Sequence, residues 1–111
     1  MKGERIVFVW IFHRVSGVVL LALLSLQLAS GFCQASPSDL GWVRALAGLH
    51  RHPALVCVLV FCVIFHALYG LRTIALDLGV RRHRLLFWVC TLLGWLLFAG
   101  FLAGYFAYVA T

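Results

Sequence analysis

Three long runs of apolar residues alternate with two short polar segments along the chain. The apolar runs cover about residues 6–32, 53–76 and 85–109. Each is longer than the roughly 20 residues that a helix rising about 1.5 Å per residue needs to cross about 30 Å of hydrocarbon. No segment alternates apolar and polar positions as a membrane β-strand does, and lipid cannot hydrate an unpaired backbone. The pattern predicts an all-α integral membrane bundle of three transmembrane helices, formed by residues 1–111 as a single domain.

The composition supports a membrane location. Of the 111 residues, 65% are hydrophobic and 11% are charged, and the mean hydropathy is +1.09. A water-soluble domain of this size could not cover so many apolar side chains with polar ones. The chain is therefore expected to use lipid as its solvent.

The basic residues are distributed unevenly between the two sides of the predicted bundle. Only Arg44 and Arg51 lie in the first connection, and none lies at the carboxyl end. The amino end and the second connection hold the larger group: Lys2, Arg5, Arg72, Arg81, Arg82 and Arg84. Because basic residues concentrate on the cytoplasmic side, we expect a cytoplasmic amino terminus and an external carboxyl terminus. The net charge of +6 then reflects topology and contact with membrane lipid, and it requires no nucleic acid.

The first apolar run has some features of an export signal, but its length and contents favour a permanent span. It contains His13 and Arg14 and is longer than the core of a signal peptide. No transit peptide precedes it, which favours a multi-pass protein of a bacterial or archaeal plasma membrane.

The connections and the remaining small residues predict local structure. The first connection fits either a surface helix capped by Ser38 or Asp39, or a plain loop. The second is a basic turn in which Gly79 ends the preceding helix. Gly100 and Gly104 share one face of the last helix and permit close approach of another helix or a flat cofactor. The four cysteines include no CxxC pair, so packing is favoured over metal ligation or a disulfide.

Ionisable side chains lie inside the predicted spans. Helix counting puts His13, Arg14 and His66 at one depth, on the order of 10 to 12 Å from the cytoplasmic boundary. An ionised arginine at this depth costs at least about 2.5 kcal/mol on insertion scales, so these side chains are expected to face the protein interior and to have partners. Arg72 is closer to the boundary, where snorkelling to the interface is the favoured interpretation.

The two histidines have the chemistry of metal ligands, because a neutral imidazole binds iron readily. Each is followed four residues later by a glycine, Gly17 or Gly70, which leaves open space beside the ring. A flat macrocycle such as haem could occupy that space, with Arg14 and Arg72 paired to its propionates. Two other interpretations stay open from the residues alone: a histidine that only hydrogen-bonds to a neighbouring helix, and two histidines that clasp one haem together.

These residues lie in two motifs that resemble a known family. The segments WIFHRVSGVVL (10–20) and FHALYGLRTIALDLG (65–79) are similar to the two signatures of the cytochrome b556 membrane anchor subunit of succinate dehydrogenase. The signatures are H-R-[VIM]-[ST]-G in the first helix and H-x-x-x-G-[IL]-R-x-x-x-x-D in the second. Both occur here in order, within the three-span layout of the family.

The resemblance implies a subunit of a heterotetrameric complex II, which oxidises succinate or reduces fumarate. A flavoprotein subunit would oxidise succinate, and an iron–sulfur subunit would relay the electrons. This chain and a second three-helix membrane anchor subunit would hold haem b and ubiquinone or menaquinone. The chain itself would not bind succinate, since it has no flavin or iron–sulfur motif and only three acidic residues.

The resemblance also implies roles for single residues. His66 aligns with an axial ligand of the haem iron, and the other axial histidine would come from the partner anchor. His13 and Arg14 align with residues beside the haem propionates and the quinone pocket, where a guanidinium would stabilise negative charge on a quinone carbonyl. Gly70 and Arg72, the latter facing a propionate, belong to the same haem-binding signature.

The sequence departs from the family pattern at the quinone site. Some members have a serine three residues before the His-Arg pair. This chain has Trp10 there, whose indole N–H could donate instead or whose ring could close the pocket. Ser16 is a candidate replacement hydroxyl. Other members have a histidine where this chain has Thr73.

The motifs therefore favour a haem- and quinone-binding membrane anchor of complex II. Two alternatives remain compatible with the sequence. One is a haem-free structural anchor or assembly subunit, because some complex II anchors lack haem. The other is a self-contained b-type cytochrome that ligates haem with both His13 and His66.

Overall fold

The computed structural model has the all-α fold that the apolar pattern predicts. It describes residues 2–36 and 38–111, with the side chains of residues 7–36 and 38–111. Over these residues the chain forms helices and no strand. The helices are α1 (Lys2–Ala35), α2 (Gly41–Leu49), α3 (Pro53–Asp77) and α4 (His83–Ala110).

Three of these helices are long and apolar enough to cross a membrane. The apolar segments are Val7–Ala35 of α1 and the whole of α3 and α4. The predicted runs match them to within a few residues, and the largest difference is at the end of α1, which continues through Ala35. Many large apolar side chains on these helices are exposed, as expected for helices whose solvent is lipid.

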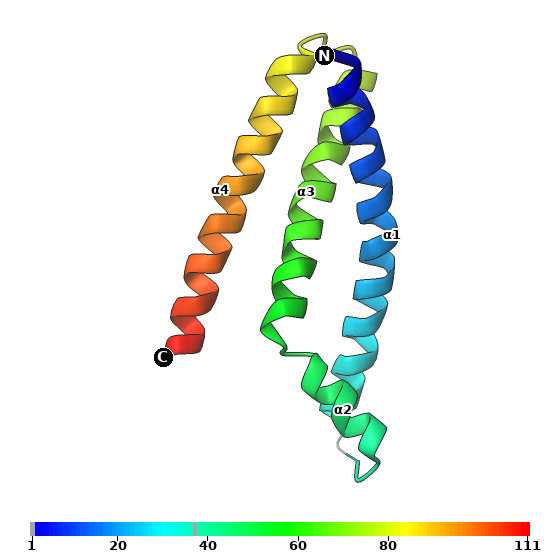
Figure 1. Cartoon of the computed structure of the whole chain (residues 1–111), viewed down its shortest axis with the longest axis vertical. Helices are drawn as coiled ribbons and strands as arrows, with labels where there is room; N and C mark the ends of the chain where they lie inside the picture. The colour runs from blue at the N-terminus through cyan, green and yellow to red at the C-terminus, as the bar shows by residue number, and fades with distance from the viewer. Residues whose placement is uncertain (1, 37) are drawn as a thin grey trace.

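The long helices stand side by side, with α3 between α1 and α4. α3 packs against both neighbours, and α2 packs against α1. The amino end of α1 lies beside the α3–α4 turn, whereas α2 and the carboxyl terminus lie at the other end, where α4 diverges from α3 (Figure 1). That the end with the amino terminus of α1 is cytoplasmic stays a prediction. The side chains of Lys2 and Arg5, on which it partly rests, lie outside the described residues.

The buried core lies in the half of the bundle near the amino terminus, where the three long helices meet. Tyr69 of α3 joins them. Its ring meets Phe12 of α1 edge-on at 5.5 Å between centroids, and its hydroxyl lies 3.0 Å from Thr91 Oγ1 of α4. Such a partner satisfies the hydroxyl of a buried tyrosine. The core residues are Val9, Phe65, Leu68, Tyr69 and Cys90, surrounded by Phe12, Phe61, Ile64 and Phe87.

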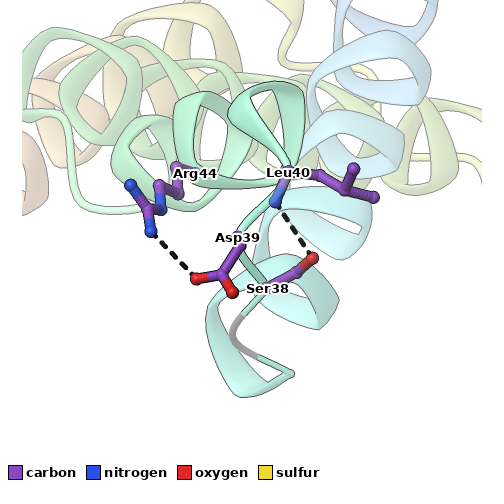
Figure 2. A network of polar contacts seen from close by, with 4 residues as sticks. All are labelled: Ser38, Asp39, Leu40 and Arg44. Carbon is purple, nitrogen blue, oxygen red and sulfur yellow. Dashed lines mark hydrogen bonds and ion pairs between the residues drawn. The ribbon is translucent and has the colours of Figure 1, made fainter.

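The first connection contains the surface helix α2 rather than a plain loop, but its predicted cap is wrong. Its N-cap residue is Leu40, which has no capping side chain. Ser38 Oγ instead accepts a hydrogen bond from the Leu40 N–H at 3.2 Å, and Asp39 Oδ1 pairs with Arg44 Nη2 at 3.1 Å (Figure 2). Both side chains of the ion pair are exposed, so it contributes little stability. The helix is held mainly by packing, with Val43 buried.

The end of α3 confirms Gly79 as the helix stop. Gly79 has a φ of 106°, in the left-handed region, directly after the C-cap residue Leu78. Its N–H donates to the Leu76 carbonyl at 3.1 Å, and the N–H of Val80 donates to the Ala75 carbonyl at 3.1 Å. These are the two bonds of a Schellman motif, in which a residue with a Cβ would be strained.

Gly94 of α4 lies against the ring of Phe65 on α3. A Cβ at Gly94 would lie 2.6 Å from Phe65 Cε1, and Phe65 is held in the aromatic core. Gly94→Ala is therefore expected to push α3 and α4 apart and to lower the free energy of unfolding by about 1–3 kcal/mol, the usual cost of overpacking. A fall in the Tm of the purified protein in detergent measures this effect.

Gly104→Ala on the same helix is the matched control, because, apart from the adjacent residues and the nearby backbone of α4, no described atom would lie within 4 Å of a Cβ at that position. Its Tm should equal or slightly exceed that of the wild type, since alanine favours a helix over glycine. A wild-type Tm for Gly94→Ala would contradict the close α3–α4 contact.

Candidate functional site

His13 of α1 and His66 of α3 stack face to face where these helices pack. Their ring centroids are 4.2 Å apart, and the ring planes differ by 2°. The shared depth expected from helix counting is thus confirmed, and the rings are in direct contact. Two imidazolium charges this close would repel each other strongly in a low-dielectric surrounding, so the stack favours at least one neutral ring. A neutral imidazole is also the form that ligates metals.

The hydrogen bonds around His66 fix which of its nitrogens carries the proton. His66 Nδ1 lies 3.2 Å from the His13 carbonyl oxygen and 3.0 Å from Ser16 Oγ, while the Ser16 hydroxyl donates to the same carbonyl at 3.0 Å. A carbonyl oxygen only accepts, so Nδ1 must be the donor. Among the described residues Nε2 makes no hydrogen bond, and its lone pair is left for a ligand. Metal-binding histidines usually have this arrangement, with the second nitrogen donating to a carbonyl.

The glycines that follow the two histidines do not leave the open space expected from the sequence. A Cβ at Gly17 would lie 3.2 Å from His66 Cε1, and a Cβ at Gly70 would lie 3.2 Å from His13 Nε2. Each ring therefore fills the space beside the glycine of the other helix. The glycines permit the close approach of α1 and α3, and the room beside Gly70 is occupied by His13 rather than free for a macrocycle.

Arg72 is buried instead of snorkelling to the interface. Its side chain is 5% exposed, and its Nε has no hydrogen-bond partner within the described part of the chain. Six residues separate it from His66, which turns it by about 240° around α3. It thus lies on a different side of α3 from His66. The structure does not bring Arg72 and the histidine pair together.

Arg14 and Trp10 form a pair on the surface of α1. The Arg14 guanidinium lies 4.6 Å from the centroid of the Trp10 ring, one helical turn earlier. This is a cation–π distance, and both side chains are exposed. Trp10 therefore supports the guanidinium from one side and leaves its other side available.

Ser16 lies inside the α1–α3 interface and is 4% exposed. It does bond to its own backbone, as serines in membrane helices often do, but it also contacts His66. The sequence interpretation of Ser16 as a quinone hydroxyl missed this contact. The signal was present in the pattern Ser-Gly, because a hydroxyl next to a glycine offers a hydrogen-bond partner and room for a ring at the same height.

The other potential metal ligands do not gather around the histidine pair. Among the described residues no group of three or more His, Cys, Asp or Glu side chains could hold a metal ion, and the four cysteines are free thiols. A metal bound here would need to bring most of its ligands with it, as the iron of a porphyrin does. One oriented imidazole with an unbonded Nε2 fits such a group.

Ser16→Ala tests the arrangement of the site. Loss of the buried hydroxyl removes one of the two acceptors of the His66 Nδ1–H, so the free energy of unfolding should fall by about 1 kcal/mol. Ser25→Ala is the control, since Ser25 is exposed and bonds to Leu21 of its own helix. Reversible unfolding in mixed micelles measures both variants. Equal losses would mean that the Ser16 hydroxyl stabilises α1 alone and not its contact with α3.

Comparison with known proteins gives a consistent result over most of the chain. Residues 5–104 match the model of the family described as succinate dehydrogenase/fumarate reductase transmembrane subunit. The chain is also 31% identical over 95 residues to the succinate dehydrogenase 2 membrane subunit SdhC of Mycobacterium tuberculosis, an alignment that covers 79% of this chain and 68% of that protein. No solved structure matches the chain significantly. The chain belongs to the succinate dehydrogenase/fumarate reductase transmembrane subunit family.

Proposed function

We propose that the chain is the membrane anchor subunit of a succinate:quinone oxidoreductase, in which it ligates haem b through His66 and forms part of the quinone site. The observation that carries the proposal is the contact of His66 Nδ1 with the His13 carbonyl oxygen, from which we infer the tautomer of His66. Its Nδ1–H is held by the His13 carbonyl and Ser16, so that Nε2 has its lone pair free. Haem b, when bound, supplies one-electron redox chemistry between the iron–sulfur subunit and quinone.

A second ligand for the haem iron would come from the second three-helix membrane anchor subunit. The lone pair of an imidazole nitrogen lies in the plane of the ring. Because His13 and His66 are stacked in parallel planes, their lone pairs cannot point at one iron between them. This geometry argues against the self-contained cytochrome, in which both histidines of one chain would clasp the haem.

Arg14 is proposed to stabilise the quinone and, with His13, the acidic groups of the haem. An arginine exposed at this depth would be costly against hydrocarbon, so its surface needs a polar partner. A quinone carbonyl gains negative charge during reduction, and a guanidinium beside it lowers the energy of that charge. Trp10 holds Arg14 in place through the cation–π contact. The quinone is proposed to be ubiquinone or menaquinone, which both have the carbonyl group that Arg14 would contact.

Arg72 is proposed to provide a buried positive charge nearer the amino-terminal end of the bundle. Its unbonded Nε leaves one donor for an acidic group such as a propionate. Gly70 takes part indirectly, because the close packing of His13 on it holds the histidine pair together.

The soluble subunits are proposed to dock at the α3–α4 turn. Arg81, Arg82 and Arg84 are exposed there and line an open depression of about 630 Å³ together with Trp88. An iron–sulfur subunit carrying the flavoprotein subunit would meet this basic surface at the cytoplasmic side of a bacterial or archaeal plasma membrane. The chain itself would bind lipid and the partner anchor but no succinate.

His66→Ala in the purified complex is expected to abolish the Soret band and to reduce the haem content by pyridine haemochrome analysis to near zero. His13→Ala should retain most of the haem, because His13 is not a ligand in this proposal. Loss of haem in both variants would favour the self-contained cytochrome. An unchanged spectrum in His66→Ala would contradict His66 as a haem ligand, and no haem in the wild type would favour the haem-free anchor.

Arg14→Gln is expected to lower succinate:quinone reductase activity about 100-fold, the usual cost of removing one donor to a developing oxyanion. Reduction of a water-soluble artificial acceptor by succinate should stay unchanged, because that reaction ends before the membrane. Arg44→Gln, at an exposed arginine of α2, is the control and should change neither rate. An unchanged succinate:quinone reductase rate in Arg14→Gln would contradict a role at the quinone, whereas equal loss of both activities would indicate that Arg14 acts in assembly instead.

A further inference from the structure

α1 carries a second copy of the contact that holds His66, about four helical turns further along. Each copy is a backbone carbonyl followed three positions later by a Ser-Gly pair. The first copy runs from His13 to Ser16-Gly17, and the second runs from Gln27 to Ser30-Gly31. The histidine held by the second copy is His50, the C-cap residue of α2. The two copies share their side-chain chemistry and hold histidines from different helices.

The distances in the two copies agree closely. Ser30 Oγ donates to the Gln27 carbonyl at 3.1 Å, His50 Nδ1 lies 3.2 Å from that carbonyl and 3.2 Å from Ser30 Oγ, and a Cβ at Gly31 would lie 3.2 Å from His50 Cε1. Ser30 is fully buried. Because the carbonyl only accepts, Nδ1 carries the proton here as well. His50 Nε2 is therefore an oriented acceptor.

His50 lines an open pocket with both polar and apolar walls. Its lining residues come from the end of the bundle that carries α2 and the carboxyl terminus. The cavity has a volume of about 510 Å³. The described residues that line it supply amide, phenol, guanidinium and imidazole groups and no carboxylate. The polar residues are Gln27, Gln34, His50, Arg51, Tyr105 and Tyr108, and Val56 and Val109 complete the wall.

Most residues that line the cavity lie near the ends of the spanning helices, so we expect it to open at the membrane–water interface. Gln34 is next to the last residue of α1, Arg51 precedes α3 by two positions, and Tyr105 and Tyr108 are in the last turns of α4. Tyrosine prefers this depth. The phosphate and glycerol groups of one leaflet occupy the same depth, on the side of the membrane that carries α2.

Charge distinguishes the two arginines of this connection. Arg44 is paired with Asp39, whereas Arg51 makes no ion pair among the described residues. A single free guanidinium in a cavity without acids is suited to a phosphate. An acceptor such as His50 Nε2 needs a donor, which a headgroup hydroxyl provides.

We propose that this cavity binds the headgroup of a phospholipid, with its phosphate on Arg51 and a headgroup hydroxyl donating to His50 Nε2. The acyl chains would leave past Val56 and Val109 into the space between the diverging α3 and α4. The repeated Ser-Gly contact thus orients one histidine in the interior of the bundle and a second one for lipid at its end.

The test uses the whole complex, purified in mild detergent, stripped of lipid and titrated with phosphatidylglycerol or phosphatidylcholine while native mass spectrometry counts bound lipid. Phosphatidylglycerol has both a phosphate and hydroxyl donors, whereas phosphatidylcholine has only the phosphate. Wild type should bind phosphatidylglycerol more tightly than phosphatidylcholine at one site per chain. Arg51→Gln should weaken phosphatidylglycerol binding about tenfold. Arg51→Lys should restore most of it, and Arg44→Gln should have no effect.

Several results would overturn the proposal. These are equal affinity for the two lipids, equal weakening by Arg44→Gln and Arg51→Gln, or recovery of a quinone in place of a phospholipid from this site. Haem content measured in the same samples should not change in Arg51→Gln. The lipid site and the proposed haem ligation therefore succeed or fail separately.

Discussion

The hydrogen bond from His66 Nδ1 to the His13 carbonyl is the interaction on which the site depends. An imidazole within a lipid-facing bundle has no water to satisfy its N–H, so the neighbouring helix must supply an acceptor. α1 does so with a carbonyl and the Ser16 hydroxyl, and Gly17 provides the room for the ring to reach them. The same bond determines which ring nitrogen of a neutral imidazole carries the proton. When Nδ1 donates, the lone pair of Nε2 is free to bind a ligand.

Much of the apolar surface of the chain is not covered by its own residues. The core is concentrated where α1, α3 and α4 meet, and much of the remaining apolar surface is exposed. At Gly100 and Gly104, no described residue comes within 4 Å of a potential Cβ. In the proposed complex, the second membrane anchor subunit would pack on such surface, because in lipid small residues allow helices from different chains to approach closely.

The sequence predicts the spans, the shared depth of the histidines and the stop at Gly79, because each depends on helix geometry or on local backbone conformation. It does not predict how α1 and α3 rotate about their own axes. That rotation put His13 beside Gly70 and buried Arg72. The sequence also predicts the N-cap of α2 wrongly. Ser38 and Asp39 have similar capping propensities, but the N-cap residue is Leu40, which has no capping side chain. Such choices depend on tertiary packing.

The reciprocal packing of the two histidines on the two glycines has a consequence for how the chain assembles. Two antiparallel apolar helices in lipid can slide past each other with little change in the surface that they bury. A slip of one turn, about 5.4 Å, would here remove both rings from their glycines and set them against larger side chains. Helices inserted one after another can therefore still reach a single alignment. Only one alignment packs His66 on Gly17 and His13 on Gly70 at the same time.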